Sequence, residues 1–237
     1  MAMIKTLSHL TGALLASLIA VSVAVPLAAQ TCSPTMRVTG GDMVDAEATE
    51  YDGNAPMRAL FKANPEDVGE YLPLYEWRFT RQNEETPFLV RYDEQTDYTF
   101  TESGSFFVEL RVSFVLGTDT IDYAMSEPFA ISISESLLEV PNAFTPNDDG
   151  SNDVFKVKNH QSIVEFKAMV FSRSGKKLYE WTDIDGFWDG RSGGRECPDG
   201  AYYLNIQARG ADGRHYNIRK TINLLRGFQQ LSGGVDE

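Results

Sequence analysis

The sequence predicts an all-β protein with two β-sandwich domains in series after an N-terminal signal peptide. Three observations predict this fold. Apolar and polar residues alternate in short runs, turn residues separate the runs at short spacing, and the charge changes abruptly near residue 137. Residues 30–137 contain 20 Asp and Glu against 7 Lys and Arg, whereas residues 138–237 contain 14 against 13. A boundary there gives two domains of about 100 residues each.

The first 29 residues have the order of a secretory signal peptide. Lys5 precedes an apolar run over residues 10–25, and the small residues Ala28 and Ala29 follow it. No later run approaches the roughly 18 consecutive apolar residues that a membrane-spanning helix needs. We therefore expect residues 1–29 to be removed on export.

Two cysteines, Cys32 and Cys197, follow the signal peptide. In an oxidising compartment they are candidates for one disulfide, although two unpaired thiols are the favoured interpretation. Acylation of Cys32 is a weaker alternative, because Thr31 is a poor fit to the small residue required before a lipidated cysteine.

The first domain, residues 30–137, is expected to begin with a loose segment over residues 35–52 that is rich in Asp, Glu, Gly and Thr. Residues 74–80 then place three aromatic side chains on one face by alternation. A longer strand over residues 106–116 carries one apolar row on alternate positions. After a turn, two further strands are expected at residues 120–124 and 129–133.

The pattern Tyr75-x-Trp77-x-Phe79, followed by Tyr98 and by the alternating residues 104–112, resembles the PKD-like, immunoglobulin-type modules of bacterial surface proteins. The family's usual Gly-Asp-Gly after the Trp strand is replaced here by Thr-Arg-Gln-Asn. The resemblance implies a spacer or a binding surface. The acidic balance of this domain argues against nucleic acid or an anionic membrane as its ligand.

The second domain repeats the strand pattern after a linker at residues 134–139. Its expected strands and turns alternate at short spacing, which predicts a second sandwich. The strands fall at residues 164–170, 177–181, 201–209 and 215–226, and turn residues lie at 173–176, 198–200 and 211–213. Residues 187–190 lead into a further, glycine-rich turn.

The run VPNAFTPNDDGSNDVF, residues 140–155, is the most unusual stretch of the chain. Its carboxylates suggest a calcium loop, but aligning Gly150 with the invariant glycine of such loops puts Thr145 and Lys156 at the two terminal ligand positions. No metal site is therefore predicted. Pro146, the Asn and Asp side chains and Gly150 instead favour a rigid polar turn.

The ten residues FTPNDDGSND, residues 144–153, resemble the FTPNxDGxND signature of the gliding motility-associated C-terminal domain. This is the type B sorting domain of the type IX secretion system of Bacteroidota. Further motifs follow in the family's order at residues 170–175, 179–181, 188–190, 198–203 and 222–226. The resemblance covers residues 138–226, and residues 227–237 are expected to form a flexible tail.

This resemblance implies Sec-dependent export to the periplasm and sorting to the cell surface, the outer membrane or the medium. It implies the type IX translocon and a PorP/SprF-like outer-membrane barrel as partners. The residues expected to carry the sorting motif or to contact the partner are Phe144, Thr145, Pro146, Asn147, Asp149, Gly150, Asn152, Asp153, Trp188, Asp189, Gly190, Gly200 and Tyr202.

No set of catalytic residues accompanies these motifs. His160 and His215 have no serine, cysteine or metal-ligand signature near them, so we expect no enzyme, no cofactor and no small-molecule substrate. The alternative function is an adhesin whose acidic first domain binds a host protein or glycan. One further resemblance is that Asp119-Thr120-Ile121 is similar to the O-glycosylation acceptor of this phylum, which makes Thr120 a candidate modification site.

Overall fold

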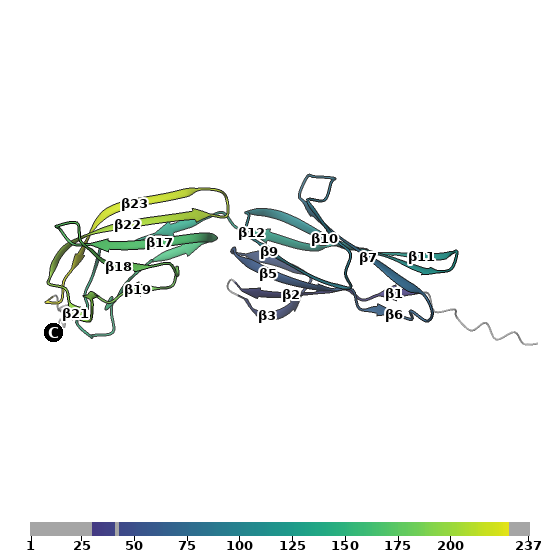
Figure 1. The fold of residues 1–237 in the computed structure, drawn as a ribbon, viewed down its shortest axis with the longest axis horizontal. Helices are drawn as coiled ribbons and strands as arrows, with labels where there is room; N and C mark the ends of the chain where they lie inside the picture. Colours follow the sequence, from purple (N-terminus) through teal and green to yellow (C-terminus); the bar gives the residue numbers. More distant parts are fainter. Residues whose placement is uncertain (1–29, 41–42, 228–237) are drawn as a thin grey trace, which may run out of the picture.

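The computed structural model describes residues 30–40 and 43–227, which form strands and connecting loops (Figure 1). The predicted signal peptide and residues 228–237 of the predicted tail lie outside the described residues. Within the described ranges, no helix has the length and apolar character needed to cross a membrane. The predicted all-β fold is confirmed.

The strands of the first domain are β1 (Thr31–Cys32), β2 (Thr35–Gly40), β3 (Met43–Ala48), β4 (Glu50–Gly53), β5 (Met57–Lys62), β6 (Pro65–Glu66), β7 (Leu72–Arg81), β8 (Leu89–Arg91), β9 (Gln95–Phe100), β10 (Gly104–Leu116), β11 (Asp119–Ala124) and β12 (Phe129–Ile133). Those of the second are β13 (Leu137–Glu139), β14 (Ala143–Phe144), β15 (Phe155–Lys156), β16 (Asn159–Gln161), β17 (Ile163–Phe171), β18 (Lys177–Trp181), β19 (Phe187–Trp188), β20 (Arg191–Ser192), β21 (Arg195–Glu196), β22 (Gly200–Gly210) and β23 (His215–Leu224).

Two sheets pack face to face in the first domain. One has the order β4-β12-β10-β7-β8, with β11 also paired to β10, and the other has the order β3-β2-β5-β9. The ring of Phe61 on β5 lies 5.7 Å from Trp77 and 5.4 Å from Phe79, both on β7. All three side chains are fully buried. The alternation read from the sequence thus places one row of each sheet in a shared aromatic core.

The expectation of a loose segment over residues 35–52 is wrong. These residues form β2, β3 and β4, and β2 pairs with both β3 and β5. Met36 and Val38 supply the buried row of β2. The stretch is rich in Asp, Glu and Thr because its other face is solvated, so only a short apolar alternation marked it as strand.

The second domain has one long sheet and a second layer of short strand pairs. The long sheet has the order β14-β23-β22-β17-β18, and β22 and β23 are in register over almost their whole length. The pairs β13-β16, β15-β19 and β20-β21 complete the domain. Its core contains fully buried aromatic side chains from short strands, Phe144, Phe155 and Trp188, beside Ile206 of the long sheet.

The segment expected as a linker, residues 134–139, is hydrogen-bonded to both halves of the chain. Ser162, which is 1% exposed, accepts the backbone N–H of Ala55 at 3.1 Å, and its hydroxyl lies 2.8 Å from that of Ser134. The backbone N–H of Ser103 donates to the carbonyl of Ala211 at 3.0 Å. These bonds join the loops of the first core to the turns of the second (Figure 1).

Ser136 provides the second group of bonds at this junction. Its hydroxyl donates to the carboxylate of Asp212 at 2.7 Å, and the hydroxyl of Tyr216 donates to its carbonyl at 3.0 Å. Burial alone would raise the pKa of Asp212. The bonds from Ser136 and from the backbone of Arg214 outweigh that effect, so the pKa lies below its usual value. Asp212 therefore stays charged at neutral pH and orders the β22–β23 turn.

Replacing Ser162 tests the junction. Ser162→Ala should lower the free energy of unfolding by about 1–3 kcal/mol, because the buried N–H of Ala55 loses its acceptor. Urea unfolding followed by tryptophan fluorescence measures the change. Ser174→Ala removes an exposed hydroxyl whose hydrogen bond among the described residues is to Ser172, and it should change the free energy of unfolding by less than about 0.5 kcal/mol. Equal effects from the two variants would contradict the role given to Ser162.

Candidate functional site

The loops that carry the sorting motifs meet at the end of the second domain remote from the first (Figure 1). Aromatic side chains lie beneath these loops and form what we call their floor. The ring of Trp188 lies 5.3 Å from that of Phe144 and 5.3 Å from that of Tyr202, and Phe155 packs 5.8 Å from Phe144. Each polar edge is satisfied, since Trp188 Nε1 donates to the carbonyl of Arg191 at 2.8 Å. The floor is therefore a closed part of the core.

Of the two roles expected for these aromatic residues, carrying the sorting motif or contacting a partner, their burial favours the first. Phe144 is 1% exposed, Trp188 is 0% exposed and Tyr202 is 7% exposed. The Tyr202 hydroxyl donates to the carbonyl of Pro198 at 2.6 Å and ties β22 to the turn before it. These side chains support the loops from below, and a partner cannot reach them in the folded domain.

The loop over residues 145–153 is folded around the carboxylate of Asp153. One carboxylate oxygen accepts the backbone N–H groups of Asn147 at 3.1 Å and Asp148 at 2.8 Å, and the other accepts that of Gly150 at 2.8 Å. The backbone N–H of Thr145 donates to the carbonyl of Asn152 at 2.9 Å and closes the loop. Asp153 thus acts as the internal acceptor of a compact anion-centred turn.

Positive φ angles allow the loop to turn so tightly. Asp148 has φ of 61°, Gly150 has 84° and Asn152 has 53°. Asp and Asn tolerate this region better than other side chains, and Gly adopts it freely. Asp149 completes the turn, because its carboxylate accepts the backbone N–H of Ser151 at 2.8 Å. The Asn-Asp-Asp-Gly-Ser-Asn-Asp run is therefore explained by backbone geometry, as the turn interpretation expected.

Arg226, at the end of the closing strand predicted from the sequence, joins the separate loops. Its guanidinium donates to the carbonyl of Pro146 at 3.1 Å and to that of Gly190 at 2.9 Å. Its Nε makes a longer hydrogen bond of 3.5 Å to the backbone carbonyl of Cys197. Its backbone N–H donates to the Asp199 carboxylate at 3.1 Å. No local pattern marks an arginine for this role, because its acceptors are backbone carbonyls.

Gly190 is required where Arg226 crosses the loops. Its φ is +78°, and an added Cβ would lie 3.0 Å from both Arg226 Nη2 and Leu224 Cδ1. Asp189 beside it is exposed and accepts the backbone N–H of Arg191 at 2.9 Å. Gly200 opens β22 at φ of +142°. These two motif glycines serve the backbone and offer no side chain to a ligand.

The exposed part of the site is consequently small and mostly acidic. The side chains of Asp148, Asp149, Asn152 and Asp189 are exposed, whereas those of Thr145, Pro146, Asn147 and Asp153 are partly buried in the loop. The described parts of the chain contain no group of three or more His, Cys, Asp and Glu side chains placed to hold a metal ion. The arrangement presents a compact surface on which three carboxylates and one amide are exposed.

The remaining candidate residues lie elsewhere. Cys32 is buried in the first core and Cys197 in the second, and both are free thiols, so the candidate disulfide does not form. Burial, with smaller contributions from Glu66 and Glu94, raises the pKa of Cys32 to about 11. Thr120 is exposed on β11, opposite Val115 of β10.

With the geometry established, the comparisons with known proteins identify the second domain. Residues 138–222 match the CHU_C Type IX secretion signal domain. The predicted resemblance to a type IX sorting domain is confirmed. The match indicates that this part of the chain directs export by the type IX system toward the cell surface or the extracellular space, and it implies an interaction with that system.

Whole-chain comparisons add little. No curated protein matches the chain. One solved structure that resembles it is the dimeric latent PorU from Porphyromonas gingivalis, at 11% identity and a TM-score of 0.25. The similarity covers 81% of this chain and 20% of that one, so the chain spans about a fifth of PorU. Likeness at this level does not establish a shared architecture.

The bridging role of Arg226 can be tested by a conservative substitution. Arg226→Lys keeps the charge but cannot donate to the carbonyls of Pro146 and Gly190 at once, so it should lower the free energy of unfolding by about 1–3 kcal/mol. Urea unfolding measures the loss. Arg195→Lys, at an exposed position of β21, is the matched control and should stay within about 0.5 kcal/mol of the parent. If both variants match the parent, Arg226 does not hold the loops together.

Proposed function

We propose that the chain is a non-enzymatic cargo or accessory protein of the type IX secretion system. Sec export delivers it to the periplasm, and its C-terminal domain then directs it to the outer membrane and cell surface. The observation that carries the proposal is the match of residues 138–222 to the type IX secretion signal domain. The immunoglobulin-like first domain is the passenger.

The partner in this proposal is a PorP/SprF-like outer-membrane barrel. The rigidity of the loop end supports a docking role, because a surface fixed by Asp153 and Arg226 loses little conformational entropy on binding. The groups available for contact are Asp148, Asp149 and Asp189. Such a surface suits a partner with basic or amide donors, since exposed carboxylates only accept hydrogen bonds.

A second candidate function is an adhesin whose acidic first domain binds a host protein or glycan. It is supported by one observation, a depression on the outer face of the first domain that is lined by Glu50, Asp52, Gln82, Ser105 and Ser132, whose side chains make no hydrogen bond or ion pair with the described residues. The two candidates are compatible, because sorting resides in the second domain and binding in the first. Thr120 is proposed as an O-glycosylation site, since its hydroxyl is exposed on β11.

Deleting residues 138–226 tests the sorting proposal. In a type IX-secreting bacterium, the full chain should be digested by protease added to whole cells, and the truncated chain should be protected in the periplasm. A periplasmic marker protein controls for cell lysis. Because the truncation also removes the junction contacts of the first domain, its folding is checked by circular dichroism. Surface delivery of a folded truncated chain at the level of the full chain would refute the proposal.

A single charge in the loop tests direct contact with the barrel. Asp148→Asn keeps a side chain that tolerates positive φ and removes an exposed carboxylate, so recovery of the barrel with the protein should fall by about tenfold without loss of stability. Asp67→Asn is the matched control, because Asp67 is also exposed and has φ of 53°. Affinity capture from solubilised outer membranes measures recovery. Equal recovery with both variants would place the contact elsewhere.

A further inference from the structure

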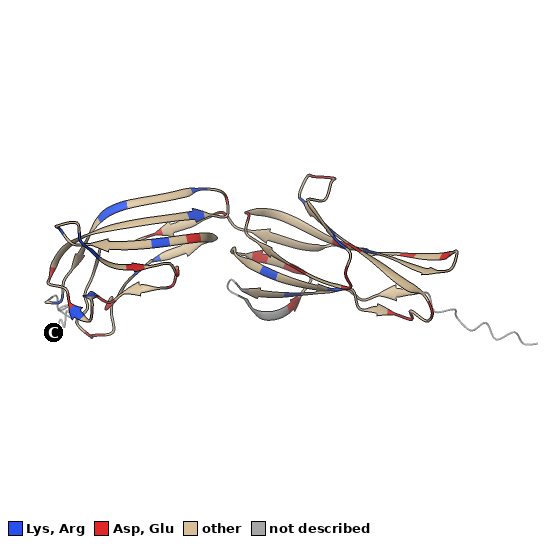
Figure 2. Cartoon of the chain, in the orientation of Figure 1, with Lys and Arg blue, Asp and Glu red and all other residues tan. Residues whose placement is uncertain are grey.

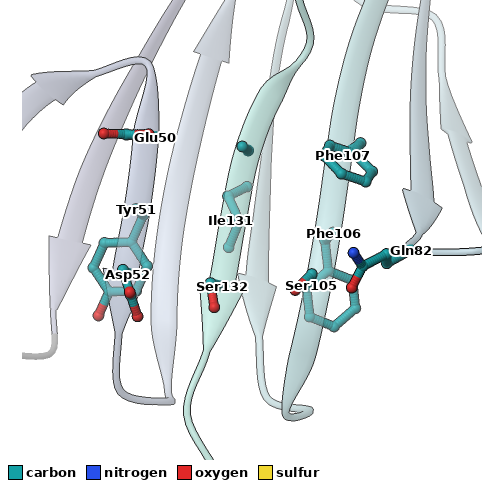
Figure 3. Close-up of a pocket in the computed structure, with 10 residues that line it drawn as sticks. Glu50, Tyr51, Asp52, Gln82, Ser105, Phe106, Phe107, Ile131 and Ser132 are labelled. Carbon is teal, nitrogen blue, oxygen red and sulfur yellow. The ribbon is translucent and has the colours of Figure 1, made fainter.

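A shallow depression of about 460 Å³ lies on the outer face of the first domain, across β4, β12 and β10 (Figure 3). Strand register arranges its side chains in two rows. Asp52 lies opposite Ser132, which lies opposite Ser105, and Gln82 follows at the end of this row. Glu50, Ala130 and Phe107 form the parallel row. The depression is thus polar along one row and bounded by an aromatic ring at the end of the other.

Five of the six polar side chains that line the depression form no bond with the described residues, whereas the hydroxyl of the sixth, Tyr51, donates to the carbonyl of Asn54 at 3.0 Å. Within residues 30–40 and 43–227, the side chains of Glu50, Asp52, Gln82, Ser105 and Ser132 make no hydrogen bond or ion pair. Elsewhere on the same face of the sheet, charges are paired, as in Arg111 with Glu109 at 3.0 Å and Arg78 with Glu76 at 3.8 Å. The difference singles out this patch, because unpaired groups that converge on one surface are available to a ligand.

Phe107 adds an apolar contact to this polar surface. The side chains on either side of it along β10, Phe106 and Val108, are buried, whereas Phe107 is 36% exposed and points outward. An exposed aromatic face beside hydrogen-bonding groups suits a ligand with an apolar face and polar edges. Pyranose rings have this form, since their C–H bonds line the faces and their hydroxyls line the edge.

The hydrogen-bonding set favours hydroxyls over a single charge. Asp52 and Glu50 only accept, the amide of Gln82 both donates and accepts, and the serine hydroxyls do either. Neighbouring hydroxyls of a sugar can satisfy all of these groups at once, whereas an ammonium group can only donate. Two carboxylates also fall short of the three or more acidic, His or Cys side chains of a metal site.

The dimensions of the depression suit a small ligand. Three neighbouring strands and two positions along each give a platform of about 10 Å by about 7 Å. The area of this platform, about 70 Å², is roughly a tenth of the 800 Å² per partner that a stable protein complex buries. The volume lies at the lower end of the about 300–1,000 Å³ typical of ligand sites. A short saccharide fits these dimensions.

We propose that the depression is a binding site for a neutral saccharide, whose ring packs on Phe107 and whose hydroxyls bond to Asp52, Ser132, Ser105 and Gln82. Acidic sugars are excluded by the carboxylates of Asp52 and Glu50. They are also repelled by the domain as a whole, because residues 30–137 contain 20 acidic and 7 basic residues. Figure 2 shows the charged residues of the described part of this domain. The proposal rests on the adhesin candidate, to which it assigns a site and a ligand class.

Binding of purified full-length protein to a panel of neutral oligosaccharides, and to matched uronic or sialic acid derivatives, tests the proposal by calorimetry. At least one neutral saccharide should bind and the acidic forms should not. Phe107→Ala and Asp52→Asn should each weaken binding by about tenfold or more. Tyr92→Ala and Glu127→Gln, which change exposed residues outside the depression, are matched controls and should leave the affinity unchanged.

The proposal is overturned if no neutral saccharide binds at about 10 mM, if acidic forms bind better, or if both depression variants bind like the parent. Unchanged urea unfolding midpoints show that the variants remain folded. If Phe107→Ala or Asp52→Asn is unfolded, Gln82→Ala is measured in its place. The assay involves no secretion step. A negative result therefore leaves the sorting proposal standing, and failed surface delivery leaves saccharide binding intact.

Discussion

The geometry of the sorting end depends on the guanidinium of Arg226. It donates to carbonyls from two loops that are 44 residues apart in the chain, those of Pro146 and Gly190. A planar group with several fixed donors can hold two such acceptors at once, which an ammonium cannot do. The charge of the guanidinium is largely removed from water. The free energy lost by this desolvation is offset by the carbonyl dipoles and by the Glu196 carboxylate, which lies 3.8 Å from Arg226 Nη1. Without this bridge the loops would still be linked by their aromatic floor and by the pairing of β15 with β19, but the carbonyls of Pro146 and Gly190 would lose their shared donor.

The floor and the bridge explain why a sorting signature contains so many residues that a partner cannot touch. Phe144 and Trp188 are buried to support the loop, Gly190 is small so that Arg226 can pass, and Asp153 is occupied by backbone N–H groups. The signature therefore specifies mostly a shape. The side chains available for contact with a partner are the exposed carboxylates at the tip of this structure, those of Asp148, Asp149 and Asp189.

Much of this could be predicted from the sequence, and the failures have physical causes. The strand over residues 106–116 was evident because its inward row is continuous, whereas β2 to β4 were missed because short strands with a solvated face leave few apolar positions. The loop was predicted to be a turn from its Asn, Asp and Gly residues. Arg226 and the depression could not be predicted, since one depends on backbone acceptors and the other on the register of three strands.

The two domains keep the sorting loops apart from the depression on the first domain. The strands β22 and β23 run from the serine-lined junction to the sorting end, and β22 alone spans about 36 Å at 3.3 Å for each of its 11 residues. The hydrogen bonds of Ser136 and Ser162 order the junction, so the passenger is held away from whatever the sorting end docks on (Figure 1). A ligand in the depression on the first domain would therefore not compete with the proposed outer-membrane partner for the same surface.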